Sequence, residues 1–174
     1  SHHGCYVASL GQFTRWLGKI CETEGIDIFC GFSGTELLYE NEKVIGVRTG
    51  DRGIDKNGNP KSNYDQGVDI HAKVTVLGEG PRGNLSKTLI KRNDLMKGKN
   101  PQVWAIGVKE LWQMPKGSVK AGYVAHTMGF PLGHDIFGGA FIYGMKDDIL
   151  DIGLVVGLDY KDPSVDPHHE LQLF

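Results

Sequence analysis

Three closely spaced glycines follow a short apolar run near the middle of the chain. Gly78, Gly80 and Gly83 satisfy the spacing G-x-G-x-x-G, directly after the β-branched residues 74–77 and before a helical pattern that starts at Asn84. Such glycines let backbone N–H groups approach a pyrophosphate, and the N-terminus of the following helix adds a favourable partial charge. The spacing therefore indicates a nucleotide-phosphate site.

The surroundings of this motif are not those of a complete dinucleotide fingerprint. A fingerprint lies inside a βαβ unit and is followed, about 20 residues later, by an acidic residue that binds the ribose. Here the preceding residues have the pattern of a β-meander, and Glu110, the next suitable acid, is too distant. An ordinary glycine-rich turn between strand and helix remains the alternative.

Composition excludes several classes of protein. With 19 basic and 21 acidic residues, the chain lacks the basic excess of a nucleic-acid binder. The basic residues at positions 87–99 fit the solvated face of a helix and its exit loop. The three cysteines contain no C-x-x-C pair, which fits a reducing compartment and excludes a self-contained iron–sulfur cluster. No apolar run approaches the roughly 20 residues of a transmembrane helix, and no signal peptide is recognisable.

The first half of the chain predicts two helices and several strands. A helix is expected over residues 10–24, capped by Ser9 and Gln12 and ended by Gly25, with Trp16 in the core. Strands are expected at 26–30, 35–39, 44–49, 68–72 and 74–77, with a long hairpin excursion over 51–67 and a helix over 84–92.

The second half has the pattern of an antiparallel sheet. Strands are expected at residues 101–111, 119–128, 136–145 and 150–158, after a polar linker at 93–100. No helix rich enough for a second Rossmann crossover is predicted here, so the sheet should pack against the first segment or against parts of a longer protein. The fold class is α+β: an α/β segment, residues 1–98, followed by an antiparallel sheet domain, residues 99–174. His168-His169-Glu170 lacks zinc-site geometry, and no metal site is predicted.

Taken together, the motifs resemble the middle of the electron-transfer flavoprotein:ubiquinone oxidoreductase family. The resemblance covers almost the whole chain and is carried by specific runs of residues. These runs are Arg15-Trp-Leu-Gly18, His71-Ala-Lys-Val74, Glu79-Gly-Pro-Arg-Gly83, Lys109-Glu-Leu-Trp112, His126-Thr-Met-Gly-Phe-Pro-Leu132, Phe137-Gly-Gly-Ala-Phe-Ile-Tyr143 and Gly153-Leu-Val-Val-Gly-Leu-Asp-Tyr160.

The resemblance implies a fragment of an enzyme that passes electrons from reduced electron-transfer flavoprotein, through FAD and a [4Fe-4S] cluster, to membrane ubiquinone. The cluster cysteines and the first FAD motif of the family are absent from this chain. The isolated fragment is therefore expected to be soluble, inactive and weak in flavin binding. The parent is expected on the inner respiratory membrane as a peripheral protein, at the matrix face in mitochondria or the cytoplasmic face in bacteria.

The resemblance implies that residues 1–98 are a partial FAD-binding domain with a β-meander and that residues 99–174 are a quinone-binding domain. It also assigns FAD-binding residues. Glu79, Gly80, Arg82 and Gly83 match the family's second FAD contact, where the position of Gly78 is often alanine. The literal glycine fingerprint is then accidental. A solvated cation at the start of the helix is the alternative for Arg82.

The predicted quinone site lies in the second half. A quinone needs donors for its carbonyl oxygens and an apolar channel for its tail. Gly138 and Gly139 match the family's backbone donors, although a β-bulge is the ordinary meaning of paired glycines in a strand. The predicted apolar wall consists of Phe130, Pro131, Leu132, Ile136 and Phe137.

Some features of this site depart from the family or allow two interpretations. Phe130 stands where the family is expected to have tryptophan, so the quinone species is open. His126 and His134 could donate protons to reduced quinone, or they could be strand-end histidines bonded to backbone. No catalytic residue is predicted, because electron transfer needs proximity more than bond-making groups.

Two rival functions remain at this stage. One is an FAD-dependent reductase or hydroxylase of the geranylgeranyl-reductase group, which has the same order of helix, hairpin and glycine turn. The other is a non-catalytic module, which the missing cofactor motifs favour. Lys109-Glu-Leu-Trp112 and Gly157-Leu-Asp-Tyr160 favour the quinone oxidoreductase over both.

Overall fold

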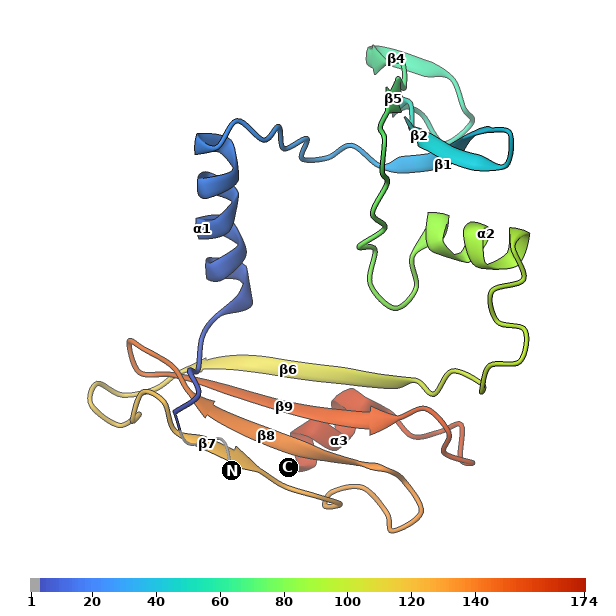
Figure 1. Ribbon diagram of the computed structural model, residues 1–174. Coiled ribbons are helices and arrows are strands. Elements are labelled where there is room, and N and C mark those ends of the chain that lie inside the picture. The colour runs from blue at the N-terminus through green and yellow to red at the C-terminus, as the bar shows by residue number, and fades with distance from the viewer. Residues whose placement is uncertain (1–3) are drawn as a thin grey trace. The chain divides into compact units, whose positions relative to one another are not determined.

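The structure, a computed structural model, describes residues 4–174 and divides into two compact units (Figure 1). One unit contains the residues up to Gly25 together with Pro101–Phe174, and the other contains Ile26–Asn100. Among the described residues, no helix has both the length and the apolar character needed to cross a membrane. The boundary between predicted domains at residues 98 and 99 stays a prediction.

The first helix, α1, runs over Leu10–Thr23. It begins where the Ser9 hydroxyl oxygen accepts a hydrogen bond from the Gln12 N–H group at 3.3 Å, and the chain leaves it through Gly25 at φ 76°. The predicted helix and N-cap are confirmed. Burial of Trp16 was wrong: its side chain is 57% exposed, and no residue of α1 is buried in the part of the chain that the structure describes.

The unit formed by Ile26–Asn100 contains the predicted meander. Strands β1 (Gly34–Glu40), β2 (Lys43–Thr49) and β5 (Asp69–His71) form an antiparallel sheet in the order β1-β2-β5. Strands β3 (Arg52–Ile54) and β4 (Pro60–Asp65) form the predicted hairpin excursion. Helix α2 (Asn84–Arg92) packs on β1 through the buried Leu85.

Two predicted strands of this unit do not form. Residues 26–30 and 74–77 are irregular, and Val74 and Val76 are exposed. β-branched residues fit a pleated, half-buried surface, but a strand also needs a neighbour for its backbone hydrogen bonds. Neither segment pairs with any strand in the described part of the chain, so local propensity alone gave the wrong result.

The other unit is built on a four-stranded antiparallel sheet, as predicted. Its strands are β6 (Ala105–Gln113), β7 (Val124–His126), β8 (Gly138–Gly144) and β9 (Ile149–Gly157), in the order β6-β9-β8-β7. The register places Leu154 of β9 between Val108 of β6 and Ala140 of β8.

One face of this sheet forms the core of its unit. Leu154 and Val156 are 0% exposed and pack with Leu132, Ala140 and Leu171. Full burial of a leucine or valine side chain is worth about 1.5–3 kcal/mol.

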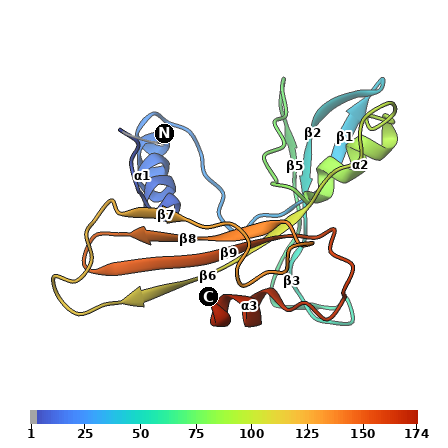
Figure 2. The same cartoon turned by 90° about the horizontal axis from the view of Figure 1, so that it is seen from below.

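Helix α3 (Pro167–Leu173) contributes to this core by packing against β6 and β9 (Figure 2). This short helix was not among the elements predicted for this half. The signals were present in the sequence: the Asp166 carboxylate accepts a hydrogen bond from the His168 N–H group at 2.9 Å, and proline follows the cap.

Candidate functional site

The glycine turn before α2 holds a carboxylate at the helix N-terminus. Glu79 Oε1 accepts a hydrogen bond from the Leu85 N–H group at 3.2 Å. Glu79 Oε2 accepts two hydrogen bonds from Ser86, one from its N–H group and one from its hydroxyl, each at 2.7 Å. Glu79 thus satisfies backbone donors of the first helical turn from six or seven residues upstream.

These contacts favour the ionised form of Glu79. The Ser86 hydroxyl and then the Ser86 N–H group hold the pKa of Glu79 below its usual range. The position that the sequence analysis gave to a ligand phosphate is therefore occupied by a side-chain anion of the chain itself. A phosphate that used the same N–H groups would have to displace Glu79.

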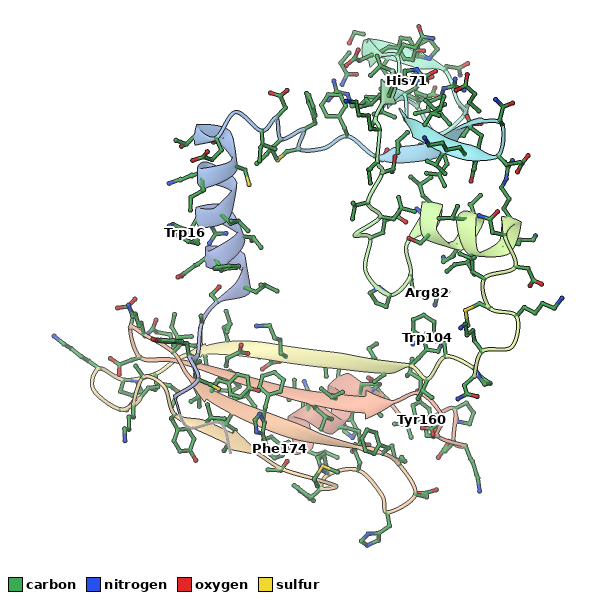
Figure 3. All side chains as sticks on the ribbon, viewed as in Figure 1. Trp16, His71, Arg82, Trp104, Tyr160 and Phe174 are labelled. Carbon is green, nitrogen blue, oxygen red and sulfur yellow. The ribbon has the colours of Figure 1, made fainter. Side chains whose placement is uncertain are left out.

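The remaining predicted FAD-binding residues lie around this cap. Gly83 is buried, and a Cβ atom on it would lie 2.5 Å from the Glu79 Cβ and Oε2 atoms, so the cap requires glycine there. Gly80 has φ 75°, and Arg82 is exposed near the bend that leads into α2 (Figure 3). The FAD contact itself stays a prediction.

The predicted quinone residues lie in the loop between β7 and β8 and at the start of β8. The rings of Phe130 and Phe137 are exposed, whereas Leu132 belongs to the core and Pro131 is half-buried. The structure therefore brings the two phenylalanines to the surface but directs Leu132 inward. The role of these residues in quinone binding stays a prediction.

Packing alone explains the two glycines at the start of β8. A Cβ atom on Gly138 would lie 2.4 Å from Leu132 Cδ1 and from the Val155 carbonyl oxygen. A Cβ atom on Gly139 would lie 2.1 Å from the Thr127 carbonyl oxygen. Both positions are regular members of the β8–β9 ladder, in register with Val156 and Val155. Their proposed role as donors to a quinone is neither required nor excluded by this geometry.

The sheet face opposite the core carries an aromatic cluster. The rings of Phe141 and Tyr143 are stacked with their centroids 4.6 Å apart. Tyr143 Oη lies 2.8 Å from His126 Nε2, within hydrogen-bond distance. The histidine thus has a side-chain partner, and its proposed role as a proton donor to reduced quinone stays a prediction.

An ion pair lies on the same face. Lys109 Nζ of β6 donates a hydrogen bond to Asp151 Oδ2 of β9 at 2.9 Å. Asp151 is only 8% exposed, and its Oδ1 atom is buried without a hydrogen-bond partner in the part of the chain that the structure describes. An unsatisfied buried carboxylate oxygen is costly, so this oxygen would accept a hydrogen bond from any donor that reached it.

Together with the N-terminal segment, this face forms a groove of about 1500 Å³. Phe141, Tyr143 and Lys109 line it, as do residues 5–13, and none of the predicted quinone-binding residues does. Stacked rings, a lysine and a carboxylate could bind a flat polar ring. These residues were not predicted as a site, although Phe141 and Tyr143 are two residues apart in one strand and Lys109 and Leu111 in another, so each pair shares a face of the sheet.

The described residues contain no arrangement that would hold a metal ion. No three His, Cys, Asp or Glu side chains between positions 4 and 174 gather for coordination. Cys5, Cys21 and Cys30 are free thiols.

Comparisons with known proteins agree with the resemblance in the sequence. Residues 104–174 match the family model described as ETF-QO, ubiquinone-binding, and this segment contains the four-stranded sheet and α3. The chain is 46% identical over 172 residues to the "Probable electron transfer flavoprotein-ubiquinone oxidoreductase, mitochondrial" of Schizosaccharomyces pombe, which covers 98% of this chain and 27% of that protein.

Relatives from an animal and a plant give the same result. The electron transfer flavoprotein-ubiquinone oxidoreductases of Sus scrofa and Arabidopsis thaliana are 41% and 43% identical, over 99% and 97% of this chain and 28% and 27% of their own lengths. The chain thus spans little more than a quarter of the curated relatives that it matches. It belongs to the electron transfer flavoprotein-ubiquinone oxidoreductase family.

Proposed function

We propose that this chain is the quinone-binding segment of an enzyme that transfers electrons from reduced electron-transfer flavoprotein to membrane ubiquinone. The observation that carries the proposal is the match of residues 104–174 to a ubiquinone-binding family model. These residues form the sheet and α3, whose core is complete within their own unit. The relatives' printed names supply the donor, the acceptor and a mitochondrial location, and the inner membrane is the site we propose.

The loop between β7 and β8 is the favoured place for the quinone ring. Phe130 and Phe137 expose two aromatic rings beside the start of β8, which gives a flat ligand apolar surface on which to stack. The groove on the sheet face is the competing place, because Tyr143 and Lys109 would offer donors to quinone carbonyl oxygens.

The glycine turn fits an FAD contact only in part. Arg82 is exposed and would pair with a phosphate, and Gly80 would allow close approach of the backbone. Glu79, however, already accepts hydrogen bonds from the Leu85 and Ser86 N–H groups, so a phosphate that used these two donors would have to displace its carboxylate. When bound, FAD would supply the electron-carrying chemistry, and the part of this chain would be to hold and orient it.

The iron–sulfur cluster does not fit this chain. A [4Fe-4S] cluster is ordinarily held by four thiolates, and the chain has three cysteines at widely separated positions. We therefore assign no step through a cluster to these residues, and the cluster of the proposed enzyme would be held by sequence outside them.

The decisive experiment is a titration of the chain with a short-chain ubiquinone analogue, followed by amide chemical shifts. Saturable shifts at residues 130–139 support the loop, and shifts at His126, Phe141 and Tyr143 support the groove. A folded chain whose spectrum does not change at saturating analogue would contradict autonomous quinone binding by this segment.

A matched pair of variants locates the ligand independently. Phe137 is 69% exposed in the loop and Leu111 is 62% exposed in the groove, so either can be truncated with little effect on folding. If the loop holds the ring, Phe137→Ala should raise the Kd about tenfold and Leu111→Ala should leave it unchanged. The reverse result would move the site to the groove.

A further inference from the structure

The connection between β3 and β4 contains the only asparagine of the chain that is followed by glycine. This asparagine is Asn57, and Gly58 follows it. Because glycine has no Cβ atom, its backbone nitrogen can approach the preceding side chain with little steric hindrance. The six other asparagines precede larger residues or proline: Asn41, Asn59, Asn63, Asn84, Asn93 and Asn100.

Hydrogen bonds fold this connection into a turn around Asp55. The Gly58 N–H group donates to the Asp55 carbonyl oxygen at 3.1 Å, as in a β-turn. Asp55 Oδ1 accepts hydrogen bonds from the Asn57 and Asn59 N–H groups, each at 2.8 Å. While the turn is closed, the Gly58 N–H group therefore has an acceptor and is held in one place.

The side chain of Asn57 is open to water on this turn. Asn57 and Gly58 are exposed, as is every residue of β4. The Asn57 side-chain amide makes no hydrogen bond to any of the described residues. Strands β3 and β4 pair only with each other in the part of the chain that the structure describes. An exposed two-stranded hairpin is marginally stable, so its turn should open at little cost in free energy.

We propose that Asn57 is a site of spontaneous deamidation, which proceeds when this turn opens. The Gly58 nitrogen loses its proton to solvent and attacks Asn57 Cγ. A Cγ–N bond forms and closes a succinimide ring, the Cγ–Nδ2 bond breaks, and ammonia leaves with a proton returned by solvent. Water then opens the ring at one of its two carbonyl carbons and leaves aspartate or isoaspartate, with no change in oxidation state.

Either product should loosen the hairpin. Both products carry a carboxylate in place of a neutral amide, so the formal net charge becomes more negative than −2. The new charge would lie close to Asp55, whose pKa is held below its usual range by the Asn59 and then the Asn57 N–H group. The two carboxylates would repel each other. Isoaspartate would also lengthen the backbone of the connection that brings Ile54 opposite Pro60.

The test is peptide mapping by mass spectrometry of the purified chain during storage at mildly alkaline pH. The peptide that contains Asn57 should gain the mass expected when OH replaces NH₂, and it should separate into aspartate and isoaspartate forms. The six other asparagines should convert at least about tenfold more slowly, because a larger following residue hinders ring closure. Digestion in heavy-oxygen water marks any conversion that occurs during the digest.

Asn59 is the matched control within the same turn. It is exposed like Asn57, but Pro60 follows it, and a proline nitrogen carries no hydrogen and cannot close the ring. Fragment ions should therefore place the modification at Asn57 alone. Equal conversion of both residues, or a modification found only at Asn59, would overturn the proposal.

Two further comparisons test the role of the turn. Asp55→Ala removes the acceptor of two N–H groups and should speed the conversion severalfold, whereas Lys56→Ala keeps those contacts and should leave the rate unchanged. A synthetic peptide of residues 54–60 gives the rate of the open chain, and the folded chain should convert more slowly than this peptide. A folded chain that stays unmodified after the peptide has converted completely would overturn the proposal. Equal rates for Asp55→Ala, Lys56→Ala and the unmodified chain would contradict control by the turn.

Discussion

Glu79 and Ser86 are joined by two hydrogen bonds of 2.7 Å, through the N–H group and the hydroxyl of the serine. This contact caps helix α2 from outside the helix and replaces the side-chain cap that Gly83, the N-cap residue, cannot provide. The turn that most resembles a nucleotide motif is thus a self-contained structural element.

Acidification should weaken this cap. The contacts lower the pKa of Glu79, first through the Ser86 hydroxyl, so the carboxylate binds its proton less readily in the folded chain than in the unfolded chain. Its stabilisation is complete above the ordinary glutamate pKa of about 4.3 and is lost as the pH falls through the lowered value. Amide exchange in the first turn of α2, measured between pH 3 and 6, should show this dependence. In the Glu79→Gln variant, the first-turn amides of α2 should be less protected from exchange at pH 6. Their protection should also change little between pH 3 and 6.

Gly83→Ala should remove the same cap by steric exclusion. The new methyl group would lie 2.5 Å from the Glu79 side chain and would push the carboxylate away from α2. We expect first-turn amides to exchange several-fold faster. Gly78→Ala is the matched control, because a Cβ atom there meets nothing within 4 Å and its φ is not in the left-handed region. Equal effects of the two substitutions would show that the cap is not the reason for glycine at position 83.

Gly153→Ala should disturb the aromatic cluster on the sheet face. A Cβ atom at Gly153 would lie 2.2 Å from Phe141 Cζ, so the ring would have to leave its stack with Tyr143. We expect a loss of about 1–3 kcal/mol in the free energy of unfolding, measured by urea denaturation, together with a changed near-ultraviolet circular dichroism spectrum.

Gly107→Ala on the neighbouring strand is the control for Gly153. Its Cβ atom would lie 3.8 Å from Val155 Cγ2, an ordinary van der Waals contact. Its urea midpoint should stay close to that of the unmodified chain. A Gly153→Ala variant with an unchanged midpoint and spectrum would mean that Phe141 is not held against this glycine.

Removal of the charge on Lys109 should lower the free energy of unfolding. Lys109→Met would leave Asp151 with two unpaired carboxylate oxygens, one of which is already buried without a partner. Lys109 is itself more than half exposed, so the loss should be about 1–2 kcal/mol in the free energy of unfolding. Lys109→Met combined with Asp151→Leu should recover most of it, and a double variant no better than the single one would contradict this account.

The sequence predicted the elements whose signals are local. Ser9 caps α1, and the alternation of residues in β6 to β9 predicts the antiparallel sheet. The predictions that failed depend on which other element packs against or pairs with a segment. Trp16 lies on an amphipathic helix but is 57% exposed, with Phe13 of the same helix as its ring neighbour. Residues 74–77 have strand propensity but no pairing partner among the described residues. Periodicity fixes which side chains share a face but does not say whether anything covers that face.

For the candidate sites, too, local sequence signals were predicted and contacts between distant residues were not. The glycine turn and the Gly138–Gly139 pair were identified from the sequence, but their close contacts with Glu79, Leu132 and Thr127 depend on backbone distances that spacing does not encode. The groove residues were missed because Phe141, Lys109 and Asp151 are brought together by the register of three strands.

The two faces of β9 provide the sharpest test of the sheet's orientation. Leu154 is 0% exposed in the core against α3 and the neighbouring strands, whereas Val155, the next residue, is 37% exposed on the other face. Leu154→Ala would leave a cavity and should cost about 2–5 kcal/mol in the free energy of unfolding, and Val155→Ala should cost less than about 1 kcal/mol. Urea denaturation of the purified variants would measure both losses. Because a shift of one residue in register would exchange the two faces, comparable losses, or a larger loss for Val155→Ala, would show that β9 is packed the other way round.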